Sequence, residues 1–197
     1  MKVLITGGAG FFGLHMTKKC VDMGEEVTLL DIAEYDKSEY DKSVKLVKGD
    51  VRDAEIMDKL ISENDVVIHA AAALPLEKKK EIFSTNVDGT RNVLELCFKH
   101  KTRKFVMISS TAVYGVPDHH PLFETDKMIG VGPYGESKIA AEKICSEYRD
   151  KGLFITTVRP KTFIGTHRLG VFQILYNWVE EGHRIPMRSE EHTSELQ

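Results

Sequence analysis

Cysteine is scarce in this sequence, and its scarcity argues against a disulfide-stabilised fold. Only three cysteines occur in 197 residues, at Cys20, Cys97 and Cys145. An odd number at these separations fits neither paired bridges nor a zinc site, and each cysteine falls in an expected helix, so we predict buried thiols in a reducing compartment. The adjacent His119 and His120 cannot easily share one metal ion, and no carboxylate–cysteine pattern surrounds them. No metal site is predicted.

Long apolar runs and an excess of positive charge are also missing. No hydrophobic stretch approaches the roughly 20 residues that span a membrane, and the chain enters a strand pattern too early for a signal peptide. The net charge of -3 provides no basic surface for nucleic acid. We therefore expect a cytoplasmic globular protein that binds a small molecule, and neither nucleic acid nor a membrane.

Strand-like and helix-like segments alternate along the chain, which predicts an α/β fold with a parallel sheet and helices on both faces. The expected strands cover residues 2–6, 26–31, 44–47, 65–69, 104–109 and 153–158. The expected helices include residues 12–23, 78–100, 132–149 and 170–182. The polar segment 33–43 is expected to be a surface connection. The length suits one domain with a substantial core.

A glycine-rich turn follows the first expected strand and is the feature around which the chain is organised. Gly8, Gly10 and Gly13 match Gly-x-Gly-x-x-Gly, and Gly7 begins a second frame with Gly10 and Gly13. Glycine allows the tight turn, the close approach of backbone to a pyrophosphate and the close packing of helix on strand. The following helix points its positive end at that phosphate. Glycines can also be plain turn residues, but the strand and helix on either side favour a Rossmann-type dinucleotide site.

An acidic residue, Asp31, ends the second expected strand, 24 residues after Gly7. A carboxylate there accepts hydrogen bonds from the adenosine ribose and repels a 2′-phosphate, so NAD is favoured over NADP. The alternative is a solvated aspartate at a strand end. Asp50 could reach the adenine edge, whereas Asp53 is expected to cap the next helix. His69 could equally be a hydrogen-bonded core residue or a cofactor contact, and we assign it no role.

Three residues form a candidate catalytic group. Tyr134 and Lys138 are four apart at the start of an expected helix, which places them on one face, one turn apart. A lysine ammonium at that distance lowers the pKa of a tyrosine, which is about 10 when unperturbed. Ser110, at the end of the fifth strand, can hold a substrate oxygen against the phenol, and Lys138 can also bind the nicotinamide ribose. Together they predict proton transfer coupled to hydride movement at a carbinol carbon.

With these motifs in this order, the chain resembles the NAD-dependent epimerase/dehydratase family, the extended short-chain dehydrogenases/reductases. The resemblance rests on residues 6–13, 49–53, 69–71, 86–90, 109–115, 134–138 and 159–160. It implies that Ser110, Tyr134 and Lys138 are catalytic, that NAD is the cofactor and that the substrate is a nucleotide sugar. The candidate cofactor-binding residues are Gly7, Gly10, Phe11, Phe12, Gly13, Asp31, Ile32, Asp50, Val51, Ala70, Ala71, Asn86, Ser109, Lys138 and Pro160.

Departures from the family pattern narrow the expected reaction. Thr111 and Ala112 stand where dehydratases of the family have an acidic pair, and Ala112 also stands where its sugar decarboxylases have a glutamate. Because both activities lack their extra acid, we expect an NAD-dependent nucleotide-sugar epimerase, with a dehydrogenase or reductase of a sugar or other hydroxyl compound as the alternative. Thr162, however, occupies a position where nucleotide-sugar 4-epimerases commonly have asparagine, which argues against their usual contact to the substrate diphosphate. A non-catalytic NAD sensor or scaffold is a third reading, disfavoured because all three candidate catalytic residues are intact.

The last ten residues, 188–197, are hydrophilic, unpatterned and unlike the sequence before them. They resemble the translation of a common sequencing adapter, so native coding is expected to end near Met187, and a genuine polar C-terminus is the alternative. We assign residues 1–187 to the NAD-binding domain, treat 188–197 as a non-native tail, and expect the family's C-terminal substrate domain to be largely missing. This form is expected to bind dinucleotide without useful turnover, and a homodimer is considered only for the full-length protein.

Overall fold

The computed structural model describes residues 1–165 and 171–183, and the chain divides into two compact units. The first unit is Met1–Lys161, which contains all of the expected strands. The second is Thr162–Gln197, in which helix α6 (Val171–Glu180) occupies most of the expected helix 170–182. The proposed non-native tail lies outside the described residues. Among the described residues, no helix is long and apolar enough to cross a membrane.

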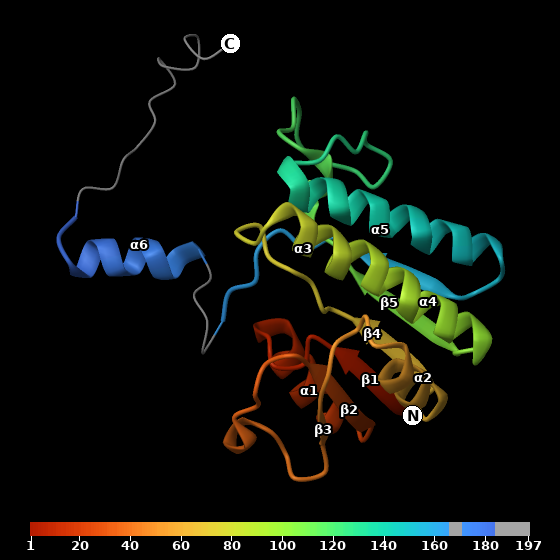
Figure 1. Cartoon of the computed structure of the whole chain (residues 1–197). Coiled ribbons are helices and arrows are strands. Elements are labelled where there is room, and N and C mark those ends of the chain that lie inside the picture. The colour runs from red at the N-terminus through yellow and green to blue at the C-terminus, as the bar shows by residue number, and fades with distance from the viewer. Residues whose placement is uncertain (166–170, 184–197) are drawn as a thin grey trace. The chain divides into compact units, whose positions relative to one another are not determined.

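The first unit is built on one sheet of six parallel strands in the order β3-β2-β1-β4-β5-β6 (Figure 1). The strands are β1 (Lys2–Thr6), β2 (Glu26–Asp31), β3 (Lys45–Lys48), β4 (Val66–His69), β5 (Lys104–Ile108) and β6 (Ile155–Val158). The predicted doubly wound parallel sheet is confirmed. Its strand order reverses between β1 and β4, and in such sheets ligands bind outside the carboxyl ends of the strands at that point.

The helices connect these strands as the alternation in sequence predicts. They are α1 (Phe11–Asp22), α2 (Ala54–Ser62), α3 (Lys79–Phe83), α4 (Thr90–Lys99) and α5 (Gly132–Asp150). The expected helix 78–100 is formed by α3 and α4 joined through a π-helical segment, η2 (Ser84–Gly89). Two short 3₁₀ turns, η1 (Lys37–Glu39) and η3 (Thr111–Tyr114), complete the unit. Asp53 caps α2 as predicted, because its carboxylate accepts the N–H groups of Glu55 and Ile56.

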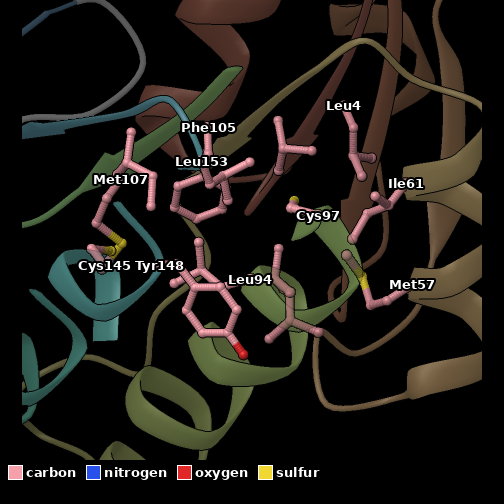
Figure 2. Packing of buried hydrophobic residues seen from close by; sticks show 14 of the residues in the cluster. Leu4, Met57, Ile61, Leu94, Cys97, Phe105, Met107, Cys145, Tyr148 and Leu153 are labelled. Carbon is pink, nitrogen blue, oxygen red and sulfur yellow. The ribbon is translucent and has the colours of Figure 1, made fainter. Parts of the chain in front are cut away.

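Two hydrophobic clusters hold the helices to the sheet. Helices α2, α4 and α5 contribute to one cluster with Leu4 and Phe105, and Figure 2 shows side chains from these elements converging. Helix α1 contributes to the other cluster, together with Val3 and Val27. Neighbouring residues such as Val3 and Leu4 enter different clusters because successive side chains of a strand point to opposite faces. The three cysteines are buried and free, as predicted.

The segment 33–43 is largely exposed, as its polar composition predicts, but one tyrosine within it is buried. Tyr40 is only 9% exposed, and its hydroxyl donates a hydrogen bond to the Gly8 carbonyl oxygen at 3.0 Å. The Tyr35 and Tyr40 rings meet edge to face with their centres 5.6 Å apart. Tyr40 thus buries its ring and Tyr35 buries part of its ring, while both hydroxyls reach backbone carbonyl oxygens. The segment therefore braces the glycine-rich turn.

Candidate active site

The glycine-rich turn lies where β1 ends, against the exit of β4. Gly7 has φ +75°, and a Cβ added there would lie 2.7 Å from the Ala71 nitrogen. A Cβ on Gly13 would lie 2.4 Å from the Gly7 carbonyl oxygen. Both positions therefore require glycine. Gly10 is the N-cap residue of α1, so the positive end of this helix lies beside the turn.

The first turn of α1 carries two further predicted cofactor-binding residues. The Phe11 ring lies 4.5 Å from the His15 ring, and Phe12 packs against the cluster beneath α1. These contacts fix the start of the helix on the sheet.

Asp31 lies at the carboxyl end of β2, directly beside the turn. Its two carboxylate oxygens accept the backbone N–H groups of Ala9 at 3.0 Å and Ala33 at 2.9 Å. Ile32, which follows, is 67% exposed. The carboxylate is thus anchored to the glycine-rich turn, where the sequence predicts a ribose contact.

Asp50 and Val51 follow β3 and are held by the side chains of Arg52, in the same loop, and of Asn92, in α4. Arg52 forms an ion pair with Asp50 at 2.6 Å, and hydrogen bonds from this guanidinium lower the pKa of the Asp50 carboxyl. The Val51 carbonyl oxygen accepts the Asn92 side-chain N–H at 2.7 Å. The carboxylate that could reach an adenine edge is therefore engaged with Arg52 in this structure.

Asn86 links the exit of β4 to the start of α5. Its side-chain oxygen accepts the Ala73 N–H at 2.8 Å, and its side-chain nitrogen donates to the Ser137 hydroxyl at 3.0 Å. The Ser137 hydroxyl in turn donates to the Tyr134 carbonyl oxygen at 2.7 Å. Asn86 is 1% exposed. Asn86, which the sequence predicts to be a cofactor-binding residue, is thus buried, and its side chain fixes the first turn of α5.

The three predicted catalytic side chains lie together between the end of β5 and the start of α5. The Ser110 hydroxyl is near enough to the Tyr134 phenol to act on its pKa, and Ser110 Oγ accepts the Ala112 N–H at 3.1 Å. Lys138 is 1% exposed, and its Nζ lies 5.8 Å from the centre of the Tyr134 ring. The same Nζ donates to the Ile108 carbonyl oxygen at 3.1 Å. The arrangement can pass a proton between a bound hydroxyl and the phenol.

Burial governs the protonation of this group. It lowers the pKa of Lys138 to about 8 and raises the pKa of Tyr134, while the hydrogen bond with Ser110 acts to lower the Tyr134 pKa. The sequence predicts a lowered Tyr134 pKa, so the net direction in the structure is the opposite. The reason is that both residues are withdrawn from water, which disfavours each charged form.

An ion pair lies beside this group, between Glu142, which the sequence did not single out, and the half-buried Arg159. Glu142 and Arg159 approach to 2.6 Å, and Glu142 also accepts the hydroxyl of Ser109, a predicted cofactor-binding residue. The carbonyl of Pro160, another such residue, accepts the Thr111 N–H at 3.0 Å. The sequence feature that could have pointed to Glu142 is its position four residues after Lys138, on the same face of the helix.

A family model and several curated proteins match this chain over most of its length. The model of the family described as "NAD dependent epimerase/dehydratase family" matches residues 3–191. A UDP-glucose 4-epimerase of Halalkalibacterium halodurans is 37% identical over 150 residues, which are 73% of this chain and 45% of that protein. One of Lactobacillus helveticus is 32% identical over 195 residues, which are 94% of this chain and 58% of that protein.

Solved structures resemble the fold closely. The UDP-glucose 4-epimerase of Thermus thermophilus in complex with NAD is 31% identical, with a TM-score of 0.80 over 94% of this chain and 64% of that one. The chain spans about half the length of the curated relatives that it matches.

Proposed function

Since the chain belongs to the NAD-dependent epimerase/dehydratase family, we propose that it is the dinucleotide-binding part of an enzyme that epimerises a nucleotide sugar. The main support is that Ser110, Tyr134 and Lys138 lie together, next to a chain of hydrogen bonds that runs through Asn86 to the exit of β4. The named relatives act on UDP-glucose, which favours a nucleotide sugar as the substrate class. Because the chain spans about half of such relatives, the activity belongs to the full-length product.

The glycine-rich turn fits the pyrophosphate of NAD. Gly7 and Gly13 let backbone segments pack more closely than any Cβ would permit, which makes the turn tight, and the positive end of α1 lies beside them. Asp31 is anchored to the same turn and suits the ribose hydroxyls. When bound there, NAD supplies a reversible hydride acceptor.

The chain's own residues would handle the proton. Tyr134 takes the proton of the sugar hydroxyl and later returns it, while Ser110 holds the oxygen of that hydroxyl against the phenol. Lys138, which donates to the Ile108 carbonyl oxygen, would also hold the nicotinamide ribose. Thr111 and Ala112 offer no acid to protonate a leaving hydroxyl, so elimination of water lacks its catalyst. Epimerisation needs only the proton shuttle and room for the intermediate to turn over.

Asp31 is expected to make the protein prefer NAD to NADP. Its carboxylate repels a 2′-phosphate, so isothermal calorimetry on this chain should give NAD an affinity roughly tenfold higher or more, about 1.4 kcal/mol. Asp31→Asn should narrow the difference, whereas Asp36→Asn, which removes an exposed carboxylate of the same segment, should not. Equal or tighter binding of NADP to the unchanged chain would overturn the assignment.

The reaction class is tested with the full-length gene product and UDP-glucose, without added NAD. We expect an isomer of unchanged mass, because hydride leaves and returns within one turnover. A product lighter by one water would exclude the epimerase proposal in favour of a dehydratase. Stoichiometric release of NADH would support the alternative, a dehydrogenase of a sugar or another hydroxyl compound.

A further inference from the structure

The Glu142–Arg159 pair joins α5 to the end of β6 in an almost closed environment. Arg159 Nη2 lies 2.6 Å from Glu142 Oε2, and its Nε donates to Oε1 at 3.0 Å, so the pair is two-pronged. The side chains are only 7% exposed for Glu142 and 18% for Arg159. A buried ion pair seldom adds net stability over apolar residues of similar volume. Its presence here therefore calls for an explanation other than stability.

Contacts at both ends of the pair lead to the catalytic region. Glu142 Oε1 accepts the Ser109 hydroxyl at 2.5 Å, and Ser109 immediately precedes Ser110. Arg159 Nη1 donates to the Tyr114 hydroxyl at 2.6 Å and to the Glu124 carbonyl oxygen at 3.1 Å. The pair thus ties α5 to the end of β5, to η3 and to the loop that leads into Tyr134.

Glu142 also lies on the same face of α5 as the catalytic side chains. Tyr134, Lys138 and Glu142 are spaced at i, i+4 and i+8, which stacks them along one side of the helix. Lys138 is buried, and burial disfavours an ammonium unless an opposite charge lies nearby. Burial has the largest effect on the pKa of Lys138 and lowers it, whereas Cys145 and then the Glu142 carboxylate act to raise it.

The other titratable groups around Lys138 carry no negative charge at neutral pH. On β4, burial lowers the pKa of His69 to about 3, so its ring is neutral. On α5, burial raises the pKa of Cys145 to about 12, so its thiol is neutral, and the pKa of Tyr134 is raised. The charged residues of α3 and η2, such as Lys79 and Asp88, are exposed at the surface.

We propose that Glu142 is a positioning residue that keeps Lys138 protonated and anchors the strand end carrying Ser110, and that Arg159 sets the charge Glu142 presents. Glu142 acts through Lys138 and does not itself meet the substrate. The inference rests on the proposed function only for the catalytic role of Lys138. The buried contacts of the pair can be tested without turnover.

The test is a pH titration of Lys138 in the 197-residue chain, followed by NMR of ¹³C-labelled lysine and assigned with Lys138→Arg. The unchanged chain should titrate at about 8. Glu142→Gln keeps an oxygen for Ser109 but removes the charge, so the midpoint should fall by roughly one unit. Arg159→Gln leaves the carboxylate unneutralised, so the midpoint should rise.

Tyr114→Phe is the matched control, because it removes a contact to the same guanidinium and keeps both charges. Its Lys138 midpoint should stay at the unchanged value. A Glu142→Gln midpoint equal to that of Tyr114→Phe, or a higher one, would overturn the proposal. Thermal unfolding measurements check that each variant is folded. If Glu142→Gln does not fold, the test passes to Arg159→Gln, and a Lys138 midpoint that does not rise in that variant would overturn the proposal. The titration needs neither NAD nor substrate, so a failed epimerase assay leaves its outcome intact.

Discussion

Gly13→Ala is expected to abolish dinucleotide binding and to destabilise the fold. The added Cβ would lie 2.4 Å from the Gly7 oxygen and 2.7 Å from both Cα and the carbonyl oxygen of Gly8. All three are backbone atoms of the glycine-rich turn and cannot rotate away, so the turn must move off α1. Overpacking of this kind typically costs about 1–3 kcal/mol. Denaturant unfolding and calorimetric titration with NAD measure the two effects.

Gly10→Ala is the matched control within the same turn. Gly10 has φ −74°, and its Cβ would meet only the Gly7 oxygen, at 3.2 Å. We expect this variant to unfold close to the unchanged chain and to bind NAD less tightly, because the new methyl group enters the space meant for the pyrophosphate. Native NAD affinity in Gly13→Ala would show that the cofactor does not use this turn.

Tyr134→Phe is expected to lower the kcat of the full-length enzyme by roughly 10² to 10⁴, the usual contribution of general acid–base catalysis. The variant keeps the ring and loses only the hydroxyl that contacts Ser110. The Kd for NAD should change little, because the glycine-rich turn and Asp31 are untouched. Steady-state kinetics and calorimetry on the same preparation separate the two quantities.

Tyr148→Phe provides the comparison for that experiment. Tyr148 lies on the same helix, is 5% exposed, and packs in the cluster beneath α4 and α5 (Figure 2). Its kcat should remain near that of the unchanged enzyme. If Tyr134→Phe has the same kcat as Tyr148→Phe, the Tyr134 hydroxyl does not take part in the mechanism.

Features that depend only on neighbouring residues in the chain could be predicted from the sequence. Strands β1 (Lys2–Thr6) and β2 (Glu26–Asp31) have the predicted bounds, because each is an apolar run closed by a turn residue or an acidic residue. The glycine requirement at Gly7 and Gly13 was also predictable, since strand, turn and helix are consecutive in the chain. The proximity of Tyr134 and Lys138 follows from helical spacing alone.

The remaining parts of the site depend on which distant segments the sheet brings together. Tyr40 reaches Gly8 across 32 residues, and Arg159 reaches Glu142 across 17. Composition predicted the exposed connection around Tyr40 but did not indicate that Tyr40 itself is buried. The direction of the Tyr134 pKa was missed for a similar reason, because burial is a property of the packed structure.

Ser109 shows a further limit of sequence reasoning. Ser109 and Ser110 are adjacent at the end of β5, and consecutive side chains of an extended segment point in opposite directions. The structure directs Ser109 toward Glu142 and Ser110 toward Tyr134. Two identical neighbours cannot be told apart until the partners on each side are known.

Transfer of the sugar's own hydride through retained NAD is the central claim of this account, and an isotope experiment tests it most directly. The full-length enzyme is given UDP-glucose with deuterium at C4, in ordinary water and without added NAD. Hydride that leaves a carbon and returns to it carries the label, whereas removal of the same hydrogen as a proton exchanges it with solvent. We predict an isomer that retains deuterium at the inverted carbon. An isomer whose deuterium has been replaced by solvent hydrogen would contradict the account.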